Sequence, residues 1–437
     1  MVNRLTLLKI AAKLINNPFL KYCDQLKQNL TFKKSELENL QSDKLNKLIN
    51  HASLNIPFYK KRFANLNLES INTLPVLSKH ELKDTGKQAV LTKKKLIKKT
   101  TSGTTGPAFS FYVDKDFFAL ELARNLRIFD FANVEIGEPW VLLVPLRDRK
   151  NFIFSKLIGR LVLDATLLSS GRTPLCCPSS KLEQFKADES MIRYFLSKIQ
   201  KHKPKLIYSY PSTLIALATY IKNWNVQGIY SKKIITSGEV LTRPARKFIE
   251  EIFQSEVFDL YGTTEFPTIA QECNEHKGLH VFIDSYYLEF TNDNEILVTD
   301  LENYTMPFIR YKTSDFGYLK PEKCGCSSAF PLMEITQGRV SDLIVTPNGK
   351  FLRADFFSSI LKKNREIKKF QIVQEEQKKL VIYLVIEKSL PGSRINFLVK
   401  RCREYVNNSL NISIETTNDI NLPLKQFFQT YPVRATL

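Results

Sequence analysis

The sequence lacks the features that mark disordered, secreted or membrane-spanning chains. Glycine accounts for only 15 of the 437 residues and long polar tracts are absent, which argues against disorder. The seven cysteines are odd in number and unevenly spaced, so they do not indicate a disulfide framework. No apolar run is long enough to cross a bilayer, and Lys9 and Lys13 interrupt the N-terminal one, so we expect no signal peptide. These absences favour a cytoplasmic protein.

What is present is an ordinary globular composition with a strong positive charge. Hydrophobic residues make up 43% and charged residues 25% of the chain, and its length allows two or three domains. The net charge of +20 would attract nucleic acid, anionic lipid or anionic substrates. No nucleic-acid-binding motif accompanies the charge, so we interpret it as a solvated surface and expect no nucleic-acid partner.

Residues 1–30 predict a basic amphipathic helix. Its apolar face consists of Leu5, Leu8, Ala12 and Ile15. This face either packs on the protein's own body, which we favour, or makes a peripheral contact with the inner face of the membrane. A second helix is predicted over 35–52, so that residues 1 to about 60 form a helical segment.

Strands and helices then alternate along the middle of the chain. The predicted strands are 140–144, 205–209, 232–236 and 257–260, and the predicted helices are 116–133, 190–201, 210–220 and 243–253. This alternation predicts an α/β domain with a largely parallel sheet.

The pattern changes near Ser285 and again near Asp342. Antiparallel strands are predicted at 287–290, 295–299 and 308–313. A hairpin at 370–375 and 379–386 and a helix at 393–410 predict a compact α+β unit. We therefore predict a large domain over 1–341 and a small domain over 342–437.

The stretch 100–107, Thr-Thr-Ser-Gly-Thr-Thr-Gly-Pro, predicts a loop that binds phosphate. Its two glycines permit close approach of the backbone, and its turned N–H groups and hydroxyls form a donor surface suited to an anion. Phe109, Phe111 and Val113 alternate with polar residues, so a strand follows the loop. A Walker loop is excluded, because it requires lysine and a helix after its second glycine.

Two further polar clusters lie where predicted parallel strands end. Gly238-Glu239 follows one strand, and Tyr261-Gly262-Thr263-Thr264-Glu265 follows the next. In open α/β sheets, ligands bind beyond the carboxyl ends of the strands. Together with the loop, these clusters predict a ligand site at that edge of the sheet.

Four motifs follow one another along the chain. They are Thr101–Pro107, Tyr261–Glu265, Pro307–Asp315 and Gly338-Arg339-Val340-Ser341-Asp342. Together they resemble the adenylate-forming (acyl-CoA synthetase-like) superfamily, and within it the phenylacetate–CoA ligase-like branch, which includes relatives linked to capsular polysaccharide biosynthesis. The resemblance covers nearly the whole chain. It implies a large N-terminal adenylate-forming domain with parallel-rich sheets and an antiparallel subdomain, followed by a small, mobile α+β C-terminal lid.

The resemblance implies a nucleotide-binding role for each motif. The residues implied are Thr101, Ser102, Gly103, Thr104, Thr105 and Gly106 at the phosphates, Tyr261, Gly262, Thr263 and Thr264 along the nucleotide and acyl site, and Gly238 and Glu239 on the adenine side. Asp315 would accept hydrogen bonds from both ribose hydroxyls, which its two carboxylate oxygens permit.

The resemblance also implies the catalytic residues. Glu265 would bind Mg²⁺, and Arg339 would contact the nucleotide. Asp342 would be the hinge about which the small domain turns. The lysine aimed at the α-phosphate would be Lys425, although the small residues that usually precede it are missing here.

Cys273, His280, Cys324 and Cys326 form a candidate structural zinc set, because three thiols and one imidazole suit tetrahedral Zn²⁺. The resemblance implies that the two segments carrying them converge. His276 is an alternative ligand. The other interpretation is buried free cysteines and a surface histidine.

We therefore expect an ATP-dependent, Mg²⁺-requiring ligase that forms an acyl- or aryl-adenylate and passes the acyl group to coenzyme A. One alternative is transfer to an amine of a sugar or amino acid in surface polysaccharide synthesis. Another is a catalytically inactive relative that binds nucleotide or membrane.

Overall fold

The structure is a computed structural model. It describes residues 18–85, 89–91, 96–100, 109–135, 138–144, 160–164, 189–229, 231–337, 343–345, 347, 351–353, 361, 366–376, 378–386, 391–406 and 409–417. The first part of the expected amphipathic helix therefore lies outside the described residues. No helix in the described part of the chain is long and apolar enough to span a membrane.

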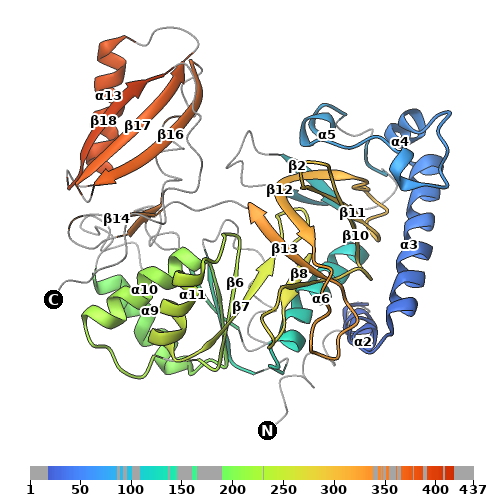
Figure 1. Cartoon of the computed structure of the whole chain (residues 1–437), viewed down its shortest axis with the longest axis horizontal. Coiled ribbons are helices and arrows are strands. Elements are labelled where there is room, and N and C mark those ends of the chain that lie inside the picture. Colours follow the sequence, from blue (N-terminus) through green and yellow to red (C-terminus); the bar gives the residue numbers. More distant parts are fainter. Residues whose placement is uncertain are drawn as a thin grey trace.

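An eleven-stranded mixed sheet runs through the larger part of the protein, in the order β10-β11-β12-β13-β9-β8-β7-β6-β5-β3-β4 (Figure 1). Its parallel half contains β4 (Arg160–Asp164), β3 (Trp140–Val144), β5 (Leu206–Ser209), β6 (Lys233–Ser237) and β7 (Glu256–Tyr261). Its antiparallel half contains β8 (Ala270–Glu272), β9 (Leu279–Val281), β13 (Leu332–Gln337), β12 (Tyr311–Leu319), β11 (Glu295–Asp300) and β10 (Tyr286–Phe290).

Helices cover both faces of the parallel half, which explains why its strands are almost continuously apolar. On one face, Ile207, Ile234 and Val257 pack with α9 (Glu189–His202), α10 (Pro211–Asn223) and α11 (Arg243–Phe253). On the other face, Leu206, Ile235 and Phe258 pack with α6 (Lys115–Phe131). Because successive side chains along each strand point to opposite faces of the sheet, they contribute to two separate cores.

The N-terminal helices pack against the antiparallel half. They are α2 (Phe19–Asn29), α3 (Lys34–Asn55), α4 (Pro57–Arg62), a 3₁₀ turn (Ile71–Thr73) and α5 (Lys79–Thr85). Helix α3 lies along β10 at the edge of the sheet (Figure 1). From α3, Gln41 donates a hydrogen bond to the Tyr286 carbonyl at 2.7 Å and Lys44 to the Asp284 carbonyl at 2.8 Å.

Buried ion pairs join α6 to the antiparallel half. Arg127 donates two hydrogen bonds to the Asp284 carboxylate, at 2.8 and 2.6 Å, and Asn29 donates a third at 2.7 Å. Arg124 donates to Asp300 at 2.9 Å and to Glu302 at 2.7 Å. The Arg127 and Arg124 guanidiniums also lie over the rings of Phe282 and Tyr286. These contacts satisfy charges that burial would otherwise destabilise.

The C-terminal part forms a separate body with its own core (Figure 1). Strand β16 (Ile367–Glu376) pairs antiparallel with β17 (Lys379–Ile386), which pairs parallel with β18 (Asn411–Thr416). Helix α13 (Gly392–Tyr405) connects β17 to β18 and packs on the sheet. A two-stranded ladder, β14 (Leu343–Val345) with β15 (Phe351–Arg353), precedes this body.

This architecture confirms the expected fold class, an α/β protein with a parallel-rich sheet, an antiparallel part and a small C-terminal α+β unit. The antiparallel strands extend the parallel sheet instead of forming a sheet of their own. The boundary at Asp342 lies outside the described residues and stays a prediction. The predicted helix at 393–410 was too long, because α13 ends at Tyr405 and β18 begins at Asn411.

Candidate functional site

The predicted phosphate loop is carried by a hairpin. Strand β1 (Ile97–Thr100) pairs antiparallel with β2 (Ser110–Val113), and Thr100 lies opposite Ser110. Residues 101–108, including Thr101, Ser102, Gly103, Thr104, Thr105 and Gly106, lie outside the described residues. The expectation that this segment connects two strands is confirmed by the ladder on either side of it.

Gly238 and Glu239 follow β6 and contact the start of α10. The Glu239 carboxylate accepts hydrogen bonds from the Ser212 N–H at 2.9 Å and the Ser212 hydroxyl at 2.8 Å. Gly238 has a φ of +78°, and a Cβ there would lie 2.9 Å from the Tyr210 ring. Only glycine fits such a position, so this loop is held tightly against α10.

The segment 261–265 leaves the end of β7 in a tight turn. A Cβ on Gly262 would lie 2.1 Å from the Pro267 carbonyl oxygen, so no other residue fits there. The Thr263 N–H donates to the Phe266 carbonyl at 2.8 Å, and the Phe266 N–H donates to the Thr263 hydroxyl at 3.2 Å. This turn leaves Thr264 exposed and directs the Glu265 side chain inward, where it is 9% exposed.

A bulge in β12 presents Asp315. Leu297 of β11 lies opposite Lys312, whereas Glu295 lies opposite Phe316, so β12 carries extra residues between these pairs. Ser314 lies in the bulge with a φ of +63°. Bulges redirect side chains next to active sites. The strand predicted over 308–313 is present, but its bounds were wrong, because β12 begins at Tyr311 and continues through the bulge to Leu319.

Two tyrosine–carboxylate pairs connect the segment 261–265 to β12. The Tyr261 hydroxyl donates to Asp315 Oδ2 at 3.1 Å, and the Tyr311 hydroxyl donates to Glu265 Oε1 at 3.0 Å. Each segment therefore supplies one donor and one acceptor to the other. The structure brings Tyr261, Glu265 and Asp315 together, as the sequence predicted for one site, whereas Arg339, Asp342 and Lys425 lie outside the described residues.

An aromatic cluster supports the same site from inside. Phe308 lies edge-on to Phe111 of β2, with ring centroids 5.7 Å apart, and to Phe266, at 5.4 Å. Tyr311 packs against Phe308 and Phe266 at 5.2 and 5.8 Å. The β1–β2 hairpin, the Glu265 turn and the Asp315 strand thus share one core, which restricts their relative movement.

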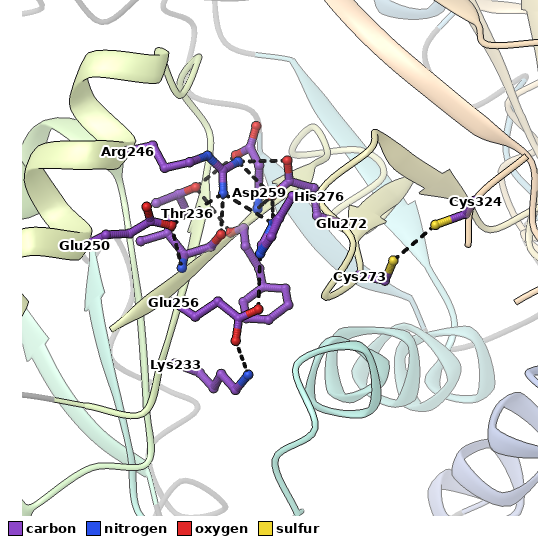
Figure 2. A network of polar contacts seen from close by, with 12 residues as sticks. Lys233, Thr236, Arg246, Glu250, Glu256, Asp259, Glu272, Cys273, His276 and Cys324 are labelled. Carbon is purple, nitrogen blue, oxygen red and sulfur yellow. Dashed lines mark hydrogen bonds and ion pairs between the residues drawn. The ribbon is translucent and has the colours of Figure 1, made fainter. Parts of the chain in front are cut away.

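A polar network lies where the two halves of the sheet meet, between α11, β7 and β8 (Figure 2). Arg246 donates to both oxygens of Glu272 at 2.7 Å, and the Asp259 N–H donates to Glu272 at 2.9 Å. Thr236 donates to the Asp259 carboxylate at 2.9 Å. Burial and the neighbouring Glu272 carboxylate raise the pKa of Asp259 to about 7. This network was not predicted from the sequence, because its members come from four different elements, β6, α11, β7 and β8.

The predicted zinc ligands come together. The Cys273 and Cys324 sulfurs lie 3.5 Å apart, and Cys326 Sγ lies 3.3 Å from His280 Nε2. All four ligand atoms lie within 4.8 Å of one another. Ligand atoms around tetrahedral Zn²⁺ are separated by about 3.5–3.8 Å. The contacts at 3.5 and 3.3 Å lie close to this spacing, and no pair exceeds it by more than about 1 Å.

The two histidines differ in their surroundings. His280 Nδ1 lies 2.9 Å from the Phe330 carbonyl, which can only accept, so Nδ1 carries the proton and the Nε2 lone pair points at Cys326. Burial lowers the pKa of His280, which keeps the ring neutral and able to bind a metal. His276 instead contacts Glu272 and Glu256, each at 3.1 Å, and is not part of the cluster (Figure 2).

Comparison with known proteins places the chain among relatives of similar length. Residues 344–425 match the family model described as the CapK C-terminal domain. Protein CapK of Staphylococcus aureus is 22% identical over 386 residues, which cover 83% of this chain and 81% of CapK. A phenylacetate-coenzyme A ligase of Pseudomonas putida is 26% identical over 344 residues, which cover 71% of this chain and 72% of the ligase.

Solved structures show the same fold. A 2-hydroxyisobutyryl-CoA ligase, in complex with 2-HIB-AMP and CoA, aligns with a TM-score of 0.63 at 16% identity, over 91% of this chain and 90% of the ligase. The resemblance expected from the four motifs is thereby confirmed. The chain is therefore similar in sequence to CapK and to phenylacetate-coenzyme A ligases, and it shares its fold with the 2-hydroxyisobutyryl-CoA ligase.

Proposed function

We propose that the protein uses ATP to convert a carboxylic acid into its acyl- or aryl-adenylate and then transfers the acyl group to coenzyme A. The observation that carries this proposal is a pair of buried carboxylates, Glu265 in the turn after β7 and Asp315 in β12. Each accepts a hydrogen bond from a tyrosine of the other segment. The matched ligases act on carboxylic acids and coenzyme A, and one solved relative holds an acyl-AMP with CoA.

In the first half-reaction, the substrate carboxylate attacks the α-phosphorus of ATP and pyrophosphate leaves. This step needs aligned reactants and neutralised charge more than a protein nucleophile. Asp315 would accept hydrogen bonds from the ribose hydroxyls, and the phosphate loop would donate to the β- and γ-phosphates. Lys425 would approach the α-phosphate, and Arg339 would contact the nucleotide.

Glu265 is suited to bind Mg²⁺. In proteins Mg²⁺ is bound through one or two carboxylates together with phosphate oxygens and water, and it would neutralise phosphate charge here. Only one Glu265 oxygen accepts a hydrogen bond from the described residues, from Tyr311. In the second half-reaction, the coenzyme A sulfur attacks the acyl carbon and AMP leaves, after the small domain has turned about Asp342.

The proposal is tested by carboxylate-dependent exchange of labelled pyrophosphate into ATP, run over aryl, fatty, hydroxy and amino acids. Exchange with one class is expected, followed by loss of free thiol when coenzyme A is added. Exchange without thiol loss would retain the adenylation step and replace coenzyme A by another acceptor. No exchange with any acid, in protein that binds ATP, would overturn the proposal.

We propose that the cluster of Cys273, His280, Cys324 and Cys326 binds a structural Zn²⁺. Burial raises the pKa of the Cys273 thiol to about 12, and a bound cation would offset this by stabilising the thiolate. The ion would join the end of β8 and β9 to the segment before β13. It would thereby hold together strands next to the Tyr261 and Asp315 pairs.

Replacing Cys324 by serine is expected to reduce the zinc content from about one ion per chain to nearly none, because serine is a poor ligand for Zn²⁺. Elemental analysis of protein purified without added metal measures this content. Cys402 of α13 is a matched control, because it is buried in the C-terminal core away from the cluster, and Cys402→Ser should retain the zinc. Native protein without zinc would rule out the site.

A further inference from the structure

Tyr311 stands beside the proposed cation-binding carboxylate. It is 3% exposed, and its hydroxyl donates to Oε1 of Glu265, which is 9% exposed. Within the described part of the chain, no hydrogen bond is made to Oε2. The contact therefore fixes one oxygen of the carboxylate and leaves the other for a ligand.

The ring that carries this hydroxyl is packed against two phenylalanine rings. Phe308 and Phe266 pack edge-on against it, with centroids 5.2 and 5.8 Å away. The backbone is held as well, because Leu77 donates to the Arg310 carbonyl and accepts from the Lys312 N–H, both at 2.9 Å. The hydroxyl therefore has little freedom to move away from Glu265.

A hydrogen-bond donor that holds a carboxylate in one orientation matters especially when the carboxylate binds Mg²⁺. Mg²⁺ demands nearly ideal octahedral geometry at about 2.0–2.1 Å, so a carboxylate that rotates freely binds it poorly. Hydrogen bonds to ligating carboxylates orient them, and their loss typically reduces metal affinity or activity by about 10–100-fold.

We propose that Tyr311 is a positioning residue that orients Glu265 for the Mg²⁺·ATP complex, a role that rests on the proposed function. Its ring belongs to the core, whereas its hydroxyl serves the site. The two roles are separable, because Tyr311→Phe removes the hydroxyl and keeps the ring.

The test compares two nucleotides in Tyr311→Phe. Calorimetry measures the binding of α,β-methylene-ATP over a Mg²⁺ titration, and the binding of AMP without Mg²⁺. The Mg²⁺ concentration for half-maximal ATP-analogue binding is expected to rise by about 10-fold. AMP affinity is expected to stay within about two-fold, because AMP reaches the ribose site without the cation.

Tyr59→Phe is the matched control. Tyr59 is 1% exposed, and its hydroxyl donates to the Pro307 carbonyl at 2.7 Å, so it too loses a buried hydrogen bond, but one that does not involve Glu265. It should lower the melting temperature and leave the Mg²⁺ requirement unchanged.

Three outcomes overturn the role of Tyr311: an unchanged Mg²⁺ requirement, equal weakening of AMP and ATP-analogue binding, or the same Mg²⁺ shift in Tyr59→Phe. A native protein that binds no ATP analogue at any Mg²⁺ concentration would instead overturn the proposed function. The two failures are therefore distinguishable.

Discussion

Arg127→Met is expected to lower the free energy of unfolding by about 3–5 kcal/mol, because it leaves the Asp284 carboxylate charged and buried without its main partner. The two side chains are 1% and 0% exposed. Urea unfolding followed by tryptophan fluorescence measures the loss. Both tryptophans, Trp140 in β3 and Trp224 after α10, report on the larger body of the protein.

Lys34→Met provides the comparison for this variant. Lys34 pairs with Glu38 on the surface of α3, where the two side chains are 73% and 55% exposed. Removing such a pair costs about 0–1 kcal/mol. If Arg127→Met were no more destabilising than Lys34→Met, the buried pair would not hold α6 to the antiparallel half.

The same pair makes the free energy of unfolding depend on pH. Burial alone would raise the pKa of Asp284, but the charge and hydrogen bonds of Arg127, with Lys44 and Asn29, lower it from 3.8 to about 2. A carboxyl group with a lowered folded-state pKa stabilises the protein above its unfolded-state value, and this stabilisation is lost as the pH falls through the folded-state value. Unfolding measured between pH 5 and 2 should show this loss mainly between about pH 4 and 2, and Asp284→Asn should lack it.

Asp315→Ala is expected to weaken ATP binding by about 100-fold, because each hydrogen bond from a ribose hydroxyl to a carboxylate contributes about 1.5 kcal/mol or more. Calorimetry with ATP and 2′-deoxy-ATP isolates the contact. The native protein should prefer ATP, and Asp315→Ala should bind both nucleotides equally weakly.

Asp293→Ala controls for loss of one negative charge, since Asp293 is exposed in the turn between β10 and β11. It should leave both affinities unchanged. If Asp315→Ala still distinguished the two nucleotides, the ribose would be bound elsewhere.

Local signals in the sequence predicted much of the fold. Helix α11 matches its predicted bounds because Thr242 caps its start and Gln254, with a φ of +49°, ends it. Strands β3, β5, β6 and β7 were predicted within a residue, because strands buried on both faces are short apolar runs.

Features that depend on pairing between distant strands could not be predicted in this way. The bulge at Ser314 exists only relative to β11, so the alternation of residues along β12 does not reveal it. The spacing of the cysteines likewise suggested a zinc set but did not choose between His276 and His280. The structure makes that choice through strand pairing. His280 of β9 lies opposite Leu332 of β13, and β13 directly follows the segment that carries Cys324 and Cys326.

The position of α3 has a consequence for the behaviour of the protein in solution. Strand β10 is the last strand of the antiparallel half, and an uncovered edge strand can pair with a strand of another molecule and start aggregation. Gln41 and Lys44 of α3 occupy carbonyl groups in and beside this strand. The helix therefore covers part of this sheet edge, and we expect β10 to pair with strands of other copies more readily in a variant without α3.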